Sequence, residues 1–185
     1  DQIIPTEYLK SIKKFGFGDF LFDGWRYLDE GRLDMVSDER SKNHEFILNK
    51  EPYTNSEILL TRDNFGCGSS REHAVWALRD FGFKAVIASS FGDIFYNNCF
   101  KNSVLPIILT KDEINHLFKI CSSSPTNFEI DLMGKNIKFD GESSYSFDVK
   151  ESLLDRIVNN IDNTENTRKQ KNHIEAIEQT RRTSR

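Results

Sequence analysis

The sequence predicts an α/β protein that continues into antiparallel strands and C-terminal helices. Short apolar runs alternate with amphipathic helical segments between residues 56 and 121, which is the order typical of α/β units. Apolar and polar residues alternate between 128 and 149, as in antiparallel strands exposed on one side. The 185 residues suffice for one buried core. We therefore expect a single domain over 1–185, with its core at about 1–150 and a helical extension over 151–185.

The N-terminal part predicts one short helix followed by an aromatic loop. Tyr8, Leu9 and Ile12 share one face of a helix over 6–13, with Thr6 as its N-cap. Residues 15–31 hold four glycines among six aromatic side chains. Glycine provides conformational freedom and aromatic rings provide contact, so this loop either closes over an apolar ligand or packs on its own core.

The middle of the chain predicts alternating strands and helices. Residues 34–43 are polar and indicate an exposed connection, and two apolar runs follow as strands over 44–49 and 56–61. Helical spacing then ends at Gly82, a natural C-cap. The remaining elements are expected as a helix over 72–81, a strand over 84–90, a helix over 93–101, a strand over 104–110 and a helix over 112–121.

The last third predicts three antiparallel strands and a helical end. Apolar residues alternate with polar ones around 128–132, 137–139 and 145–149, and glycine-containing turns separate them. A helical apolar face spans Leu153 to Ile161, and a final helix is expected around Ile174 and Ile177.

Charge and cysteine content narrow the function classes. A net charge of −4 argues against a protein whose main partner is nucleic acid, because phosphate binding needs surplus Lys and Arg. Cys67, Cys99 and Cys121 contain no C-x-x-C pair and form neither a disulfide framework nor a metal-ligand set. Free thiols imply a reducing compartment. With neither a membrane-length apolar run nor a signal-peptide pattern, we expect a cytoplasmic location.

The stretch "NFGCGSSREH" at 64–73 carries the candidate chemistry. It is expected as a strand end, a glycine turn and a helix start. Unpaired N–H groups at a helix N-terminus attract anions, and Gly66 and Gly68 let the main chain approach a ligand. On spacing alone, Ser69 and Glu72 also fit a helix capping box, which would make Ser69 a structural cap. Cys67 near a helix start is a weaker candidate for a nucleophile, with His73 as its only local base.

Residues 64–109 resemble the small subunit of 3-isopropylmalate dehydratase, a member of the aconitase superfamily. The opening "DQIIP" is similar to the end of that family's D-T-D-Q-I-I-P signature. The segment over 21–31 and the final "IEAIEQTRR" are also similar to family sequences. The resemblance spans nearly the whole chain. It implies a compact β/β/α fold like the swivelling fourth domain of aconitase.

The resemblance also implies a reaction, a cofactor and a partner. The family isomerises 2-isopropylmalate to 3-isopropylmalate through isopropylmaleate in leucine biosynthesis. A separate large subunit carries a four-iron four-sulfur cluster, so this chain is expected to bind no metal itself and to be active only with that partner.

Site residues follow by the same resemblance. Ser69 corresponds to the base that removes the carbon-bound proton, and Arg71 to the arginine that binds a substrate carboxylate. Ser70, Asp1 and Leu9 are expected to contribute to substrate binding. The loop after the signature helps to choose the side group of the substrate, and Leu9 beside Lys10 leaves open whether that group is apolar or a carboxylate.

Two alternatives remain at this stage. The chain could serve a homoaconitase or another aconitase-type hydro-lyase, with the same machinery and a different malate. It could also be a non-catalytic anion-binding regulatory module, although its acidic balance speaks against RNA binding.

Overall fold

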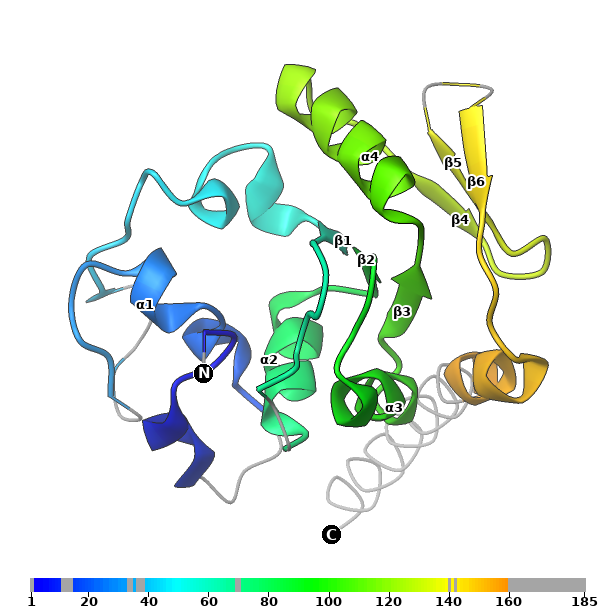
Figure 1. Ribbon diagram of the computed structural model, residues 1–185. Coiled ribbons are helices and arrows are strands. Elements are labelled where there is room, and N and C mark those ends of the chain that lie inside the picture. Colours follow the sequence, from blue (N-terminus) through cyan, green and yellow to red (C-terminus); the bar gives the residue numbers. More distant parts are fainter. Residues whose placement is uncertain are drawn as a thin grey trace, which may run out of the picture.

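A computed structural model of the chain describes residues 2–10, 15–32, 35, 39–68, 71–139, 141 and 143–159 (Figure 1). The expected helix around Ile174 and Ile177 lies outside these residues, as does most of the expected extension over 151–185.

The centre of the fold is a parallel sheet of three strands. Its order is β1 (Ile58–Leu60), β2 (Ala85–Ala88) and β3 (Leu105–Ile108), with Leu59 opposite Val86 and Val86 opposite Pro106. The helices α2 (His73–Phe81) and α3 (Asp93–Lys101) connect the strands. All four residues of β2 are buried, as expected for a parallel strand covered on both faces. The predicted strand–helix–strand order is confirmed.

Successive side chains of β2 enter two different apolar clusters, because strand side chains alternate between the faces of a sheet. Val86 belongs to the first cluster, which joins the N-terminal segment to α2 and α3. Ala85 and Ile87 belong to the second, which joins α4 to the antiparallel strands. The central strand therefore ties the two halves of the core together.

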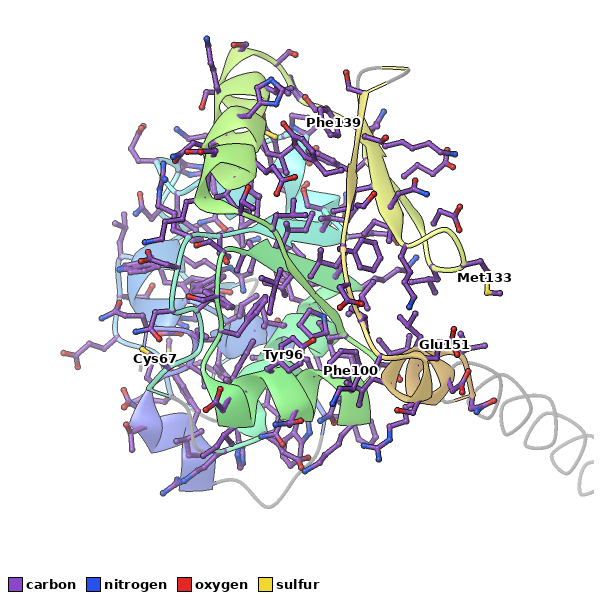
Figure 2. The ribbon with its side chains drawn as sticks, turned by 45° about the vertical axis from the view of Figure 1, so that its right-hand side comes forward. Cys67, Tyr96, Phe100, Met133, Phe139 and Glu151 are labelled. Carbon is purple, nitrogen blue, oxygen red and sulfur yellow. The ribbon has the colours of Figure 1, made fainter. Side chains whose placement is uncertain are left out.

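The second cluster is built by α4 (Lys111–Ser123) and an antiparallel sheet. Thr110 and Glu113 form a capping box that starts α4. The sheet contains β4 (Glu129–Asp131), β5 (Asn136–Phe139) and β6 (Ser143–Ser146), in that order. Figure 2 shows Phe139 on the side of this sheet that faces α4, and Met133 pointing away from it. The three predicted antiparallel strands are confirmed, and residues 151–159 are helical as predicted.

The N-terminal part consists of short helical turns, of which η2 packs on α2 (Figure 1). They are η1 (Thr6–Lys10), η2 (Gly18–Phe20), α1 (Asp23–Arg26), η4 (Ile47–Asn49) and η5 (Tyr53–Asn55). The prediction of a strand over 44–49 is wrong. The side-chain Nδ2 of Asn49 donates to the carbonyls of Arg26 (2.7 Å) and Asn43 (2.9 Å), which closes a turn where extended backbone was expected.

The aromatic loop over 15–31 packs on its own core and also reaches a surface hollow. Phe17, Phe20, Leu21 and Phe22 are buried in the first cluster. Phe20 stacks on Tyr8 of η1 with ring centroids 4.1 Å apart. The packing on its own core is therefore confirmed. Closure over an apolar ligand stays a prediction, and Phe22 also lines the hollow described below.

The close packing of this loop on α2 gives a stability prediction. A Cβ on Gly18 would lie 2.7 Å from the main chain of Asp80 and Phe81, which cannot move without disturbing α2. Gly18→Ala should therefore lower the free energy of unfolding by about 1–3 kcal/mol. Nothing lies within 4 Å of a Cβ on Gly24, so Gly24→Ala is the matched control and should change stability by less than about 1 kcal/mol. Urea unfolding followed by circular dichroism measures both, and equal effects would contradict this account.

Candidate functional site

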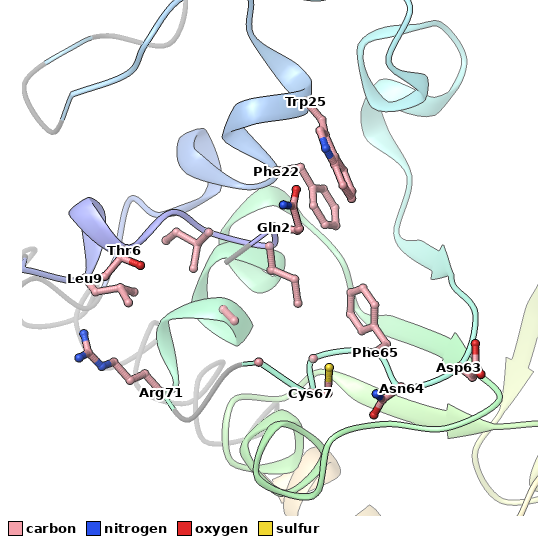
Figure 3. Close-up of a pocket in the computed structure, with 15 residues that line it drawn as sticks. Gln2, Thr6, Leu9, Phe22, Trp25, Asp63, Asn64, Phe65, Cys67 and Arg71 are labelled. Carbon is pink, nitrogen blue, oxygen red and sulfur yellow. The ribbon is translucent and has the colours of Figure 1, made fainter.

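A hollow of about 510 Å³ lies between the N-terminal segment, the Phe22 to Trp25 region and the turn that follows β1 (Figure 3). One end carries Arg71 and Leu9, and Trp25 lies towards the other in the view of Figure 3. The turn comes directly after the carboxyl end of a parallel strand, which is where α/β sheets commonly bind ligands. The lining residues are Gln2, Ile3, Ile4, Thr6, Leu9, Phe22, Trp25, Asp63, Asn64, Phe65, Gly66, Cys67, Gly68, Arg71 and Ala74.

The turn over 64–68 is fastened to the loop over 89–92, which follows β2. The amide of Phe65 donates to the carbonyl of Ser90 at 3.0 Å, and the amide of Gly92 donates to the carbonyl of Phe65 at 2.9 Å. The amide of Asn64 donates to Ser90 Oγ at 2.7 Å. These bonds extend the pairing of β1 and β2 beyond the strands themselves, as a parallel bridge between Phe65 and Phe91.

Two glycines allow the loops to approach this closely. A Cβ on Gly66 would lie 2.3 Å from the ring of Phe95 in α3, and the φ of Gly66 is 74°. A Cβ on Gly92 would lie 2.8 Å from the Cα of Cys67. Glycine at 66 therefore serves the packing of the turn on α3, in addition to opening the main chain towards the hollow.

The start of α2 differs from the predicted capping box. The helix begins at His73 with Glu72 at the N-cap position, and the Glu72 side chain makes no capping hydrogen bond. Glu72 is therefore not at the third helical position that the box requires. Its carboxylate instead lies near Asn102 Nδ2 (3.5 Å) and Lys101 Nζ (4.0 Å), at the end of α3.

Comparison with known proteins identifies the chain's relatives. Residues 1–112 match the family described as the aconitase C-terminal domain. The whole chain is 47% identical to a 3-isopropylmalate dehydratase small subunit of Neisseria meningitidis, covering 87% of that protein. A small subunit of Marinobacter nauticus is 47% identical over 183 residues, which is 98% of this chain and 85% of that protein. The chain belongs to the 3-isopropylmalate dehydratase small subunit family.

A solved structure agrees with this membership. The crystal structure of a 3-isopropylmalate dehydratase from Methanocaldococcus jannaschii matches 92% of this chain and 90% of its own, with a TM-score of 0.58 and 26% sequence identity. The mixed α/β fold with parallel and antiparallel sheets is thus the fold of this family, as the sequence predicted.

The site residues expected from the family motif divide into two groups. Leu9 and Arg71 line the same hollow, although 61 residues separate them in the chain. Asp1, Ser69 and Ser70 lie outside the described residues. Of the motif itself, residues 64–68 and Arg71 line this hollow.

Several residues of the site were not predicted. Phe22 and Trp25 stack with ring centroids 5.8 Å apart and form an apolar wall, which the composition of the 15–31 loop indicated only in general terms. Ser90, which bonds to the lining residue Asn64, was not predicted either. The signal that could have found it is its position directly after the buried strand β2, at the same edge of the sheet as the motif.

Metal and membrane features follow from the described residues. No group of three or more His, Cys, Asp or Glu side chains within the described ranges could hold a metal ion. Among the same residues, no helix is both long enough and apolar enough to cross a membrane. The part of the chain that the structure describes thus offers no ligand set for an iron–sulfur cluster.

The cysteines differ in exposure, which gives a reactivity prediction. Cys67 is exposed beside the hollow, whereas burial raises the pKa of the Cys99 thiol and so disfavours its reactive thiolate. Iodoacetamide at neutral pH should therefore modify Cys67 in the folded chain and Cys99 only after unfolding. Peptide mapping by mass spectrometry measures this order, with Cys67→Ser as the control. Modification of Cys99 in the folded chain at the rate of Cys67 would contradict the burial.

Proposed function

We propose that this chain, together with a large subunit, interconverts 2-isopropylmalate and 3-isopropylmalate through isopropylmaleate. The observation that carries the proposal is similarity over the whole chain to small subunits of this enzyme. It is combined with a hollow that is lined by both Arg71 and the apolar Leu9. The large subunit is proposed to supply a four-iron four-sulfur cluster, which would act as the Lewis acid on the departing hydroxyl. The free thiols support a cytoplasmic location.

Arg71 is proposed to hold one carboxylate of the substrate. It lines the hollow and is exposed there. A guanidinium can bind a carboxylate by two parallel hydrogen bonds, which fixes the orientation of the substrate as well as its charge. Arg71 lies two residues before the start of α2, and that helix is packed in the core. The backbone of Arg71 therefore adjoins the first turn of a firmly placed helix.

Ser69, as an alkoxide, is proposed to take the carbon-bound proton on its Oγ as the double bond forms and the hydroxyl departs. A general acid of the assembled site would donate the proton that converts the departing hydroxyl to water. Readdition of water to isopropylmaleate with the opposite regiochemistry gives the isomer. A serine is a useful base only where its alkoxide is stabilised, and the N–H donors near a helix start, together with Arg71, are the groups in this motif that provide such stabilisation. Ser70 and Asp1 are proposed to contribute further polar contacts to the substrate.

The apolar lining favours an isopropyl side group over a second side-chain carboxylate. Leu9 and Ile3 line the hollow beside Phe22, and burying an unpaired carboxylate against such residues is costly. This lining supports Leu9 as the contact to the side group of the substrate.

The proposal predicts that the chain is inactive alone and active with its large subunit. The two chains, combined without oxygen, should convert 3-isopropylmalate into isopropylmaleate, followed by ultraviolet absorbance. They should turn over homoaconitate at least tenfold less efficiently. Preference for homoaconitate would contradict the assignment of the substrate.

In the same assay Ser69→Ala should lower kcat by about 10²- to 10⁴-fold, because proton transfer loses its base. Ser143→Ala, an exposed serine in β6, is the control and should retain normal turnover. Normal turnover by Ser69→Ala would exclude Ser69 as the base while leaving the rest of the proposal standing.

A further inference from the structure

Asn64 adopts an unusual backbone conformation at the entrance to the motif turn. Its φ is 57°, in the left-handed region that few residues other than glycine adopt, although asparagine does so more readily than most. Asn64 is also one of the residues that line the hollow. Such a conformation persists only where surrounding contacts enforce it, and it is common at functional sites.

Ser90 supplies a side-chain contact that holds this conformation. Its Oγ accepts the hydrogen bond from the Asn64 amide at 2.7 Å, and its carbonyl accepts from the Phe65 amide at 3.0 Å. Two consecutive amides of the turn therefore bind a single residue of the neighbouring loop. The backbone bridge between Phe65 and Phe91 fixes Phe65. The Asn64 carbonyl accepts from the Cys67 amide within the turn (3.3 Å), so the Ser90 hydroxyl is the contact that ties Asn64 to the neighbouring loop.

Ser90 is itself placed by the most buried element of the fold. It follows the central strand β2 by two residues, and Ile87 and Ala88 of that strand are fully buried. The other end of its loop is fixed by the bond from the Gly92 amide to the Phe65 carbonyl. Through its hydrogen bond to Asn64, the Ser90 hydroxyl fixes the turn relative to the buried strand β2.

We propose that Ser90 is a positioning residue for the reaction. Its hydroxyl holds Asn64 in the left-handed conformation and so directs the turn that leads to Ser69. This inference rests on the proposed function, since the reaction defines what the turn must position. Ser90 does not line the hollow among the described residues, so its effect passes through Asn64.

Loss of the hydroxyl should affect kcat more than KM. A short serine side chain cannot compensate for a displaced backbone, and displacements of about 1 Å reduce rates strongly. Arg71 is long and lies next to the first turn of α2, so carboxylate binding should adjust. In the complete complex, Ser90→Ala should therefore lower kcat about tenfold, the effect of losing one hydrogen bond, and change KM less than twofold.

Two variants separate positioning from general destabilisation. Ser90→Thr keeps the hydroxyl and should keep kcat within about threefold of the unmodified enzyme. Ser89→Ala is the matched control, because the Ser89 side chain makes no hydrogen bond within the part of the chain that the structure describes. An unchanged kcat in Ser90→Ala, an equal loss in Ser89→Ala, or a loss in Ser90→Thr as large as in Ser90→Ala would overturn the proposal.

Amide hydrogen exchange provides a readout that needs no activity. In the full chain, exchange of the Asn64 amide should quicken about tenfold in Ser90→Ala and stay unchanged in Ser89→Ala. Unaltered exchange in Ser90→Ala would show that the hydroxyl does not hold Asn64 and would overturn the inference. If the unmodified complex fails to turn over isopropylmalate, the proposed function fails, while the exchange result still decides whether Ser90 holds the turn.

Discussion

The backbone contact between the loops that follow β1 and β2 is the constraint on which the candidate site depends. Phe65 exchanges two hydrogen bonds with the 89–92 loop. A side chain at Gly92 would collide with the main chain of Cys67, and one at Gly66 with the ring of Phe95 in α3. Parallel strands end at the same edge of the sheet, so this contact holds the turn that precedes Ser69 and Arg71 in a fixed position relative to the sheet. The motif is therefore placed by residues about 25 positions further along the chain.

A second constraint fixes the opposite wall of the hollow. Arg40 forms a buried ion pair with Asp23, and its guanidinium lies 3.8 Å from the centroid of the Tyr27 ring. Burial raises the pKa of Tyr8, and the nearby Asp23 carboxylate raises it further, so the hydroxyl stays neutral beside the pair. Buried charges of this kind need one defined arrangement of their partners. The arrangement holds η1, with Leu9, against the loop that provides Phe22 and Trp25.

The sequence predicted the parallel strands, their helices and the antiparallel strands, because each has a clear apolar period. It failed at 44–49, where hydrogen bonds from the side chain of Asn49 close a turn in spite of a strand-like run of apolar residues. At the site, the family motif led to Arg71 and Leu9, and the structure brings both to one hollow. Ser90 could not be predicted in the same way, because its role depends on strand order and on the backbone of Asn64, which no local pattern records.

The central claim is that this hollow is the substrate site and that the large subunit completes it. The rate at which iodoacetamide modifies Cys67 tests it directly, since this exposed thiol lies in the hollow wall. The large subunit with 3-isopropylmalate should slow the modification of Cys67 at least tenfold relative to the chain alone. Cys121 on α4, outside the lining of the hollow, is the internal reference. An unchanged rate at Cys67 in an active complex would contradict the account.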